Sequence, residues 1–160
     1  MNKNIKILSI LFIIGIAVFY LTSCKKAEPP KDLLQKIREK GIIVAGVKYD
    51  SKPFGFIDKD QKIKGFDVDL VREIAKRVLG NENAVKFQQV TSSNRIFSLT
   101  SGNVDLVAAT MTINAKRSQV IDFSIPYFIA GQAIIVPQSS SINSIKDLNN
   151  RKIAVVLGTT

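Results

Sequence analysis

Two threonines and an arginine follow one apolar segment of the chain, and together they could bind a small anion. Residues 104–109 predict a buried strand, after which Thr110 and Thr112 present hydroxyl groups and Arg117 a guanidinium group. Alternation along a strand end places both hydroxyls on one side, and a helical turn from Asn114 would bring Arg117 back toward them. A guanidinium donates two parallel hydrogen bonds to a carboxylate. The spacing therefore favours a carboxylate site, although a buried strand followed by a surface helix with an exposed arginine gives the same pattern.

The composition limits the classes of function that this chain can have. Its 160 residues, 46% of them hydrophobic and 22% charged, suffice for one domain of modest size. The formal net charge of +10 is compatible with nucleic acid, an anionic membrane surface or an anionic ligand. The basic residues are scattered and no aromatic RNA-binding motif is present, so we expect no nucleic-acid partner. With no histidine and one cysteine, the chain has no His/Cys zinc site and no histidine-based triad, and we expect no metal and no cofactor.

The N-terminal residues have the pattern of a secretory signal. Two lysines lie within residues 1–6, and an uncharged, mostly apolar run occupies residues 7–21. This run is shorter than the roughly 20 residues of a membrane-spanning helix, although an uncleaved anchor is the alternative. The sequence Leu21-Thr22-Ser23-Cys24 resembles the bacterial lipoprotein box, in which the cysteine is lipidated and becomes the mature N-terminus. The resemblance implies a signal peptide over residues 1–23, a lipidated Cys24 that attaches the protein to the outside of a membrane, and a tether over residues 24–32.

Strands and helices alternate through the rest of the chain. Hydrophobic periodicity and glycine stops predict helices over residues 31–40, 67–79 and 94–101, a hairpin over residues 56–63 and a helical turn over residues 144–148. Apolar segments predict strands over residues 42–47, 84–90, 104–110, 132–136 and 152–156. This alternation predicts an α/β fold with a largely parallel sheet.

Candidate ligand-binding residues follow these predicted strands. Ligands of such sheets bind at the carboxyl ends of the strands. Four separate loops present polar side chains there: Lys48 follows the first strand, Arg95 the second, Thr110 and Thr112 the third, and Thr159 and Thr160 the last. Their common position is stronger support for a site than any one of them.

Several stretches, taken in order, resemble the extracellular solute-binding proteins of family 3 type that serve polar amino-acid ABC transporters. The resemblance extends from about residue 33 to residue 160. It implies a periplasmic-binding-protein-like fold of two α/β lobes that close around one amino acid. We expect a nearly complete first lobe over residues 33–126, a hinge crossing at 127–131, and the beginning of a second lobe at 132–160. The stretches are GFDVDL (65–70), DLVAATMTI (105–113), Arg117, DFSIPYF (122–128), IKDL (145–148) and GTT (158–160).

The same resemblance assigns roles to individual residues. The arginine that matches Arg117 grips the ligand α-carboxylate, and the positions of Thr110 and Thr112 add hydroxyl or backbone contacts. The Gly-Thr-Thr loop, with Thr159 and Thr160, closes on that carboxylate from the other side. In this family the chain continues and supplies a carboxylate for the ligand ammonium group. We therefore expect the sequence to be a fragment of a longer receptor.

The identity of the amino acid depends on two further cations. Members that bind basic amino acids or glutamine usually have an aspartate and an aromatic residue where this chain has Lys48 and Ser51. The loop around Lys48, and Arg95 after Ser-Ser-Asn, are similar to those of glutamate- and aspartate-binding members. An acidic ligand would balance these cations, because an unpaired buried cation is costly. The alternatives are ion pairs with Asp50 and Asp67, and glutamine or another polar amino acid as ligand.

The resemblance as a whole implies a lipid-anchored extracytoplasmic receptor that delivers glutamate or aspartate to the permease of an ABC importer. We expect a binding protein, monomeric when complete, and not an enzyme. Dehydratase chemistry on the same scaffold is the enzymatic alternative, but the site lacks the paired carboxylates or histidine of general acid–base catalysis. The sensor domain of a signalling receptor is the third alternative.

Overall fold

The computed structural model describes residues 32–160. The expected signal peptide, Cys24 and most of the tether lie outside this range, and their predictions stay predictions. All the helices and strands below belong to one unit, Leu33–Thr160. No helix in this unit is both long enough and apolar enough to cross a membrane.

A parallel sheet of three strands forms the centre of this unit, which confirms the predicted α/β fold. The strands lie in the order β5-β1-β6, and β1 is parallel to both neighbours. Val47, the last residue of β1, is in register with the last residues of both neighbours, so the three carboxyl ends meet at one edge. The strands are β1 (Ile43–Val47), β5 (Val85–Gln89) and β6 (Leu106–Ala108).

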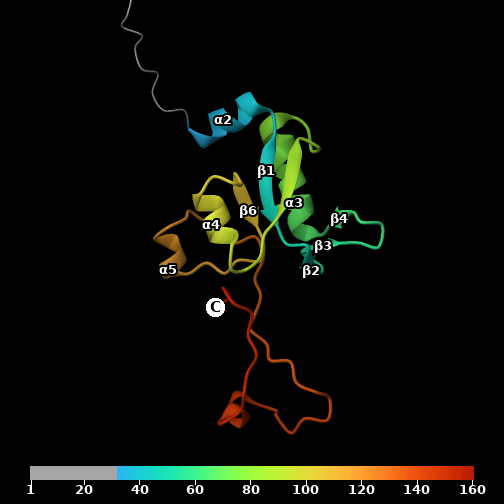
Figure 1. Ribbon diagram of the computed structural model, residues 1–160, viewed down its shortest axis with the longest axis vertical. Helices are drawn as coiled ribbons and strands as arrows, with labels where there is room; N and C mark the ends of the chain where they lie inside the picture. Colours follow the sequence, from blue (N-terminus) through green and yellow to red (C-terminus); the bar gives the residue numbers. More distant parts are fainter. Residues whose placement is uncertain (1–31) are drawn as a thin grey trace, which may run out of the picture. The chain divides into compact units, whose positions relative to one another are not determined.

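Helices cover both faces of the sheet. Figure 1 shows α3 on one side of the strands and α4 on the other, with α2 beyond the amino end of β1. Asp105, just before β6, accepts hydrogen bonds from the Val44 backbone N–H (2.7 Å) and from Lys40 at the end of α2 (3.2 Å). This carboxylate therefore ties α2 to the sheet. The helices are α2 (Leu33–Lys40), α3 (Phe66–Leu79), α4 (Arg95–Thr100) and α5 (Ala115–Ser118).

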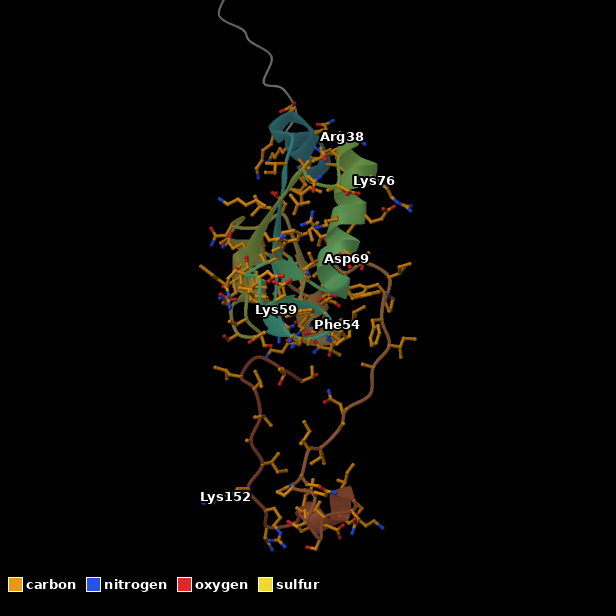
Figure 2. All side chains as sticks on the ribbon, turned by 90° about the vertical axis from the view of Figure 1, so that its right-hand side faces the viewer. Arg38, Phe54, Lys59, Asp69, Lys76 and Lys152 are labelled. Carbon is orange, nitrogen blue, oxygen red and sulfur yellow. The ribbon has the colours of Figure 1, made fainter. Side chains whose placement is uncertain are left out.

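The long helix α3 buries one face against the strands. Its side chains Val68, Val71 and Ala75, at spacings of three and four residues, are at most 1% exposed. They share the core with the inward residues of β1. Gly80 ends the helix, as the glycine stop predicted. It has the left-handed conformation, and its N–H donates to the Lys76 carbonyl. Figure 2 shows Asp69 and Lys76 along the exposed side of α3, with Phe54 near the amino end of the helix.

Between β1 and α3 in the sequence, the chain forms a small antiparallel sheet, which contains the predicted hairpin. The Asp58 carboxylate organises the turn, because it accepts backbone hydrogen bonds from Asp60 and Lys62 and pairs with Lys64. Gly65, the residue before α3, has φ 127°, and an added Cβ there would lie 2.2 Å from the Phe54 carbonyl oxygen. The strands are β2 (Asp50–Ser51), β3 (Gly55–Ile57) and β4 (Ile63–Lys64).

The segment after residue 128 differs from the sequence-based expectation. Residues 132–136 and 152–156, predicted as strands, form none, whereas the predicted helical turn is present as the 3-10 helix η1 (Ile145–Leu148). A strand needs a hydrogen-bonded neighbour, and these apolar segments lie apart from the sheet, with Ile135 97% and Val155 81% exposed. The η1 turn needs no such neighbour, because Ser144 and Asp147 form a capping box.

Candidate functional site

Arg117 is held at the carboxyl edge of the sheet by the short helix α5. The Asn114 side chain caps this helix and accepts a hydrogen bond from the Arg117 backbone N–H (2.9 Å). The turn directs the guanidinium back to the segment after β6, where Nη1 donates to the Thr112 carbonyl oxygen (2.7 Å). The spacing thus predicted the meeting of Arg117 with Thr112, although the contact is made to the backbone and not to the hydroxyl.

Arg95 reaches the same region from the other side, as the first residue of α4. Its Nη1 donates to the Ala109 carbonyl oxygen at 2.6 Å, directly before Thr110. Its Nη2 donates to the Gly158 carbonyl oxygen at 3.2 Å, and Nη2 of Arg117 donates to that same oxygen at 3.0 Å. One carbonyl therefore accepts from both guanidinium groups.

These two arginines carry unbalanced positive charge inside the protein. Arg95 is 2% and Arg117 8% exposed, and no carboxylate of residues 32–160 forms an ion pair with either. Burial, and then the charge of Arg117, lower the pKa of Arg95. The Nε–H of Arg95 is buried without a hydrogen-bond partner in the described part of the chain. Buried charges are normally paired, so this arrangement is suited to a small anion.

Thr110 does not take the position that strand alternation predicts. The strand β6 ends at Ala108, and Thr110 has φ 49°, in the left-handed region. The alternation rule therefore cannot place its hydroxyl beside that of Thr112. Left-handed backbone is rare for a β-branched residue, so its surroundings must hold it. Thr110 and Thr112 nevertheless both line a hollow of about 360 Å³, whose lining includes neither Arg95 nor Arg117.

Of the three remaining candidates, Thr160 makes a hydrogen bond to the segment after β6, whereas Thr159 and Lys48 make none to it in the described part of the chain. The Thr160 hydroxyl donates to the Thr112 hydroxyl (3.4 Å), whereas the Thr159 hydroxyl turns back to the Val156 carbonyl (2.7 Å). Lys48 is half-buried after β1 and, within residues 32–160, makes no ion pair with Asp50 or Asp67. Burial raises the pKa of Asp67, and the Lys48 charge is the smallest of the contributions that oppose this shift. Within residues 32–160 the Lys48 ammonium group thus forms neither of the two ion pairs that the sequence offered as alternatives.

The Gly158 backbone lies very close to the loop before α4. Gly158 has φ 82°, and an added Cβ would lie 2.3 Å from the Ser92 carbonyl oxygen and 2.8 Å from Ser93 Cα. Only glycine adopts this backbone conformation without cost and also fits this space. The predicted Gly-Thr-Thr loop thus meets the arginines through a glycine carbonyl, a contact that side-chain reasoning could not identify.

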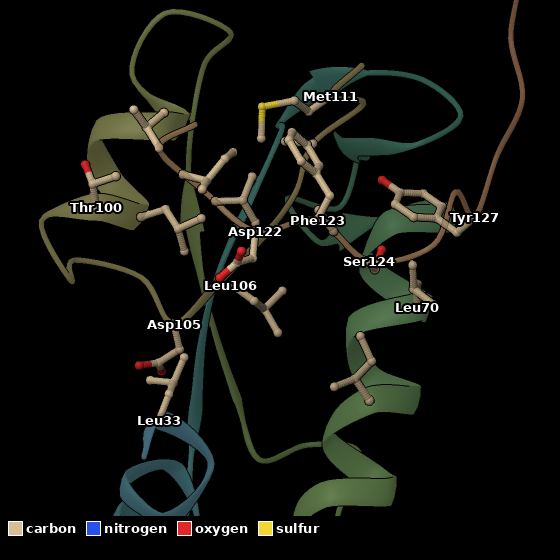
Figure 3. Close-up of a pocket in the computed structure, with 17 residues that line it drawn as sticks. Leu33, Leu70, Thr100, Asp105, Leu106, Met111, Asp122, Phe123, Ser124 and Tyr127 are labelled. Atoms are coloured by element: carbon tan, nitrogen blue, oxygen red, sulfur yellow. The ribbon is translucent and has the colours of Figure 1, made fainter. Parts of the chain in front are cut away.

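A second hollow, about 520 Å³ in volume, lies beside β6 and is separate from the arginines. Figure 3 shows Leu33, Leu70, Leu106 and Phe123 among its mostly apolar lining, with Tyr127 at one end. Neither arginine lines it. The anion site is therefore defined by the hydrogen bonds of the two arginines at the carboxyl edge of the strands, and by neither hollow.

No sequence pattern indicated the buried hydrogen bond between Asp67 and Tyr127. Asp67 is fully buried in the first turn of α3, and its Oδ1 accepts from the Tyr127 hydroxyl at 3.0 Å. Burial raises the pKa of Asp67, although the Tyr127 hydrogen bond, the Thr110 backbone and Lys48 oppose the shift. The two residues are 60 positions apart, so only the fold shows their contact.

Comparison with known proteins identifies the family. Residues 43–156 match the model of the bacterial extracellular solute-binding proteins, family 3, so the chain belongs to this family. A glutamine-binding protein of Geobacillus stearothermophilus is 44% identical over 116 residues, which are 72% of this chain and 44% of that protein. The ABC transporter glutamine-binding protein GlnH of Bacillus subtilis is 39% identical over 165 residues, covering 97% of this chain and 60% of that protein. The chain thus spans about half the length of these curated relatives.

Solved structures support the two-lobe fold class. A mutant of ArgBP from T. maritima superposes with a TM-score of 0.74 at 37% identity, over 81% of this chain and 56% of that one. These matches confirm the expected fold class. The expectation that the ligand is glutamate or aspartate is supported less well, because a glutamate/aspartate import solute-binding protein of Salmonella typhimurium is only 28% identical. The two glutamine-binding proteins above are more similar, at 44% and 39% identity.

Proposed function

We propose that this protein binds a free polar amino acid and holds its α-carboxylate at Arg117. The observation that carries the proposal is the presence of two buried guanidinium groups that have no carboxylate partner within residues 32–160, at the edge where parallel strands end. Each guanidinium donates to backbone carbonyls and keeps further N–H groups for a ligand. The hydroxyls of Thr110, Thr112 and Thr160 supply the polar contacts around the carboxylate.

We propose L-glutamine as the ligand. The support is that the two relatives at 44% and 39% identity are both named as glutamine-binding proteins. The amide of glutamine carries an acceptor oxygen that the free N–H groups of Arg95 could bind without a second negative charge.

Glutamate or aspartate is the second candidate ligand, and Arg95 is the observation that favours it. A second carboxylate would neutralise the buried, unpaired charge of Arg95 and reduce its repulsion with Arg117. Lys48 gives less support than its sequence position indicated, because it does not line the hollow that Thr110 and Thr112 share.

In the cell we propose the role of a receptor that passes its ligand to the permease of an ABC importer. The family name places its members outside the cytoplasm. Attachment through a lipidated Cys24 would keep the receptor near the permease, and a lobe closing over the ligand would include the Gly158 to Thr160 loop. These parts of the proposal rest on the resemblance and on the relatives, not on contacts within residues 32–160.

The test is a calorimetric titration of the full chain with a panel of single amino acids: glutamine, glutamate, aspartate, arginine, histidine, cystine and leucine. Glutamine should bind most tightly, with glutamate next and leucine not at all. Tighter binding of glutamate would establish the second candidate. Selective binding of leucine, or of none of the panel at millimolar concentration, would overturn the proposed function.

A further inference from the structure

The turn over residues 91–94 joins the end of β5 to Arg95, the first residue of α4. The Thr91 backbone N–H donates to the Asn94 side-chain oxygen at 2.8 Å, and the Asn94 backbone N–H donates to the Thr91 hydroxyl oxygen at 3.3 Å. This is the reciprocal pattern of a capping box, in which two residues three positions apart each use a side chain to satisfy the backbone of the other. Thr91 and Asn94 are called the clasp below.

The clasp fixes the point from which the Arg95 side chain starts. The Arg95 backbone N–H donates to the Thr91 carbonyl oxygen at 3.1 Å, so the residue that begins α4 is bonded to the clasp directly. The Asn94 carbonyl oxygen accepts from the Ser98 backbone N–H at 2.9 Å and continues the turn into the helix. Val90, directly before the clasp, donates its N–H to the end of β1 at 3.0 Å. The clasp is therefore joined to the sheet on one side and to α4 on the other.

Exposure distinguishes the clasp from the side chain that follows it. Thr91 and Asn94 are exposed, whereas Arg95 is 2% exposed. The guanidinium group lies at the end of a long side chain, so a small change in the backbone of Arg95 becomes a larger displacement of its N–H groups. In the described part of the chain its Nε–H has no hydrogen-bond partner, and Nη1 and Nη2 donate to backbone carbonyl oxygens alone. The direction of the guanidinium group therefore depends on the backbone at residue 95.

We propose that Thr91 and Asn94 are positioning residues for the amino-acid site, and that they hold the Arg95 guanidinium group in the direction that meets the ligand side chain. This inference rests on the proposed function, in which the free N–H groups of Arg95 bind the amide oxygen of glutamine or a second carboxylate. The clasp acts through Arg95 and not through a contact of its own with the ligand. A change in this exposed turn therefore alters the choice between ligands.

The main variant is Asn94→Ala, which removes the acceptor of the Thr91 N–H. In calorimetric titrations of the full chain we expect affinity to fall about tenfold for glutamate and about threefold for glutamine, because the charged ligand depends more on the direction of Arg95. Equal losses for both ligands would overturn the inference, since a general loss of structure weakens both alike.

Asn81→Ala is the matched control for this variant. The Asn81 side chain also accepts a backbone hydrogen bond in an exposed turn, from the Asn83 N–H at 2.9 Å, but this turn follows the carboxyl end of α3. Affinity for either ligand in Asn81→Ala should stay within about twofold of the parent. A loss of the same size as in Asn94→Ala would overturn the inference.

A conservative pair of substitutions at Thr91 tests the other half of the clasp. Thr91→Val keeps nearly the same shape but has no hydroxyl oxygen, whereas Thr91→Ser keeps the acceptor for the Asn94 N–H. Thr91→Val should weaken glutamate binding about threefold, less than Asn94→Ala because the hydrogen bond it removes is the longer one, at 3.3 Å. Thr91→Ser should stay within about twofold of the parent. Equal losses in the two variants would overturn the inference.

A second background separates positioning from a general loss of structure. Without the Arg95 guanidinium group the clasp has nothing to direct. In an Arg95→Met background, Asn94→Ala should therefore change the affinity for either ligand less than about twofold. The same loss in both backgrounds would overturn the inference, because the clasp would then act without Arg95.

A measurement without ligand keeps this inference separate from the proposed function. In NMR spectra of the full chain, the Arg95 Nε–H should exchange with water at least about fivefold faster in Asn94→Ala than in the parent, with the Arg117 Nε–H unchanged. In Asn81→Ala both should exchange as in the parent. If no amino acid binds, the proposed function fails and this exchange result alone decides the inference. Unchanged exchange of the Arg95 Nε–H in Asn94→Ala would overturn it.

Discussion

Replacing Arg95 with methionine separates the two candidate ligands. Methionine fills much of the space of the arginine side chain but carries no charge and donates no hydrogen bond. If Arg95 faces the ligand side chain, glutamate loses a charge partner whereas glutamine loses only a donor to its amide oxygen. We therefore expect Arg95→Met to weaken glutamate binding more than glutamine binding.

The magnitude follows from the burial of the site. Arg95 is 2% exposed, and removing one partner of a desolvated charge pair costs about 2–5 kcal/mol. The lower figure corresponds to about a 30-fold loss of affinity. A neutral hydrogen bond contributes about 1 kcal/mol, so glutamine should lose only about fivefold. The ratio of the two losses, about sixfold or more, is the predicted signal.

The folded state should tolerate this change. Arg95→Met removes the hydrogen bonds to the carbonyl oxygens of Ala109 (2.6 Å) and Gly158 (3.2 Å). It also removes a buried charge that lacks a carboxylate partner and repels Arg117. These opposing contributions should leave the free energy of unfolding within about 2 kcal/mol of the parent.

The assay is a calorimetric titration of the parent and of Arg95→Met with glutamine and with glutamate. Arg77→Met is the matched control, because the Arg77 side chain is 78% exposed and the substitution changes net charge equally. Equal losses for both ligands would show that Arg95 does not contact the ligand side chain. A loss in the Arg77 control of the same size would attribute the effect to net charge.

Two further changes test the surroundings of the site. Gly158→Ala should weaken ligand binding at least about fivefold, because a Cβ at φ 82° would lie 2.3 Å from the Ser92 carbonyl oxygen. Gly131→Ala, with open space around it, is the control and should bind as the parent does. Equal ligand affinities of the two variants would contradict this prediction. Asp67→Asn tests the raised pKa of Asp67. A carboxyl whose pKa is higher in the folded state stabilises the fold below its unfolded-state pKa of about 3.9, and this stabilisation is lost as pH rises through its folded-state pKa. In urea denaturation Asp67→Asn should therefore gain stability relative to the parent between about pH 4 and pH 7, and a constant difference would contradict the prediction.

Local patterns predicted the regular part of the fold well. The apolar periodicity of α3, the buried strand β1 and the left-handed Gly80 are set by neighbouring residues in sequence. Arg117 was also predictable, because Asn114 caps the turn that returns its side chain to Thr112. These features depend on interactions within a few residues, which the sequence displays directly.

Long-range contacts explain what the sequence did not reveal. The left-handed backbone of Thr110 overrides strand alternation, and Asp67 meets Tyr127 across 60 residues. The Gly158 carbonyl bridges both arginines through the backbone, which no side-chain motif indicates. Segments 132–136 and 152–156 have the composition of strands, but composition supplies no hydrogen-bonded partner.

The central claim is that the Arg117 guanidinium binds the carboxylate of a free amino acid. The most direct measurement is calorimetric titration of the parent and Arg117→Ala with L-glutamine and with its α-carboxamide analogue, using Arg77→Ala as the charge control. The account predicts at least about a 30-fold loss of glutamine affinity in Arg117→Ala alone, and equally weak binding of the analogue to parent and variant. Glutamine affinity unchanged in Arg117→Ala would contradict the account.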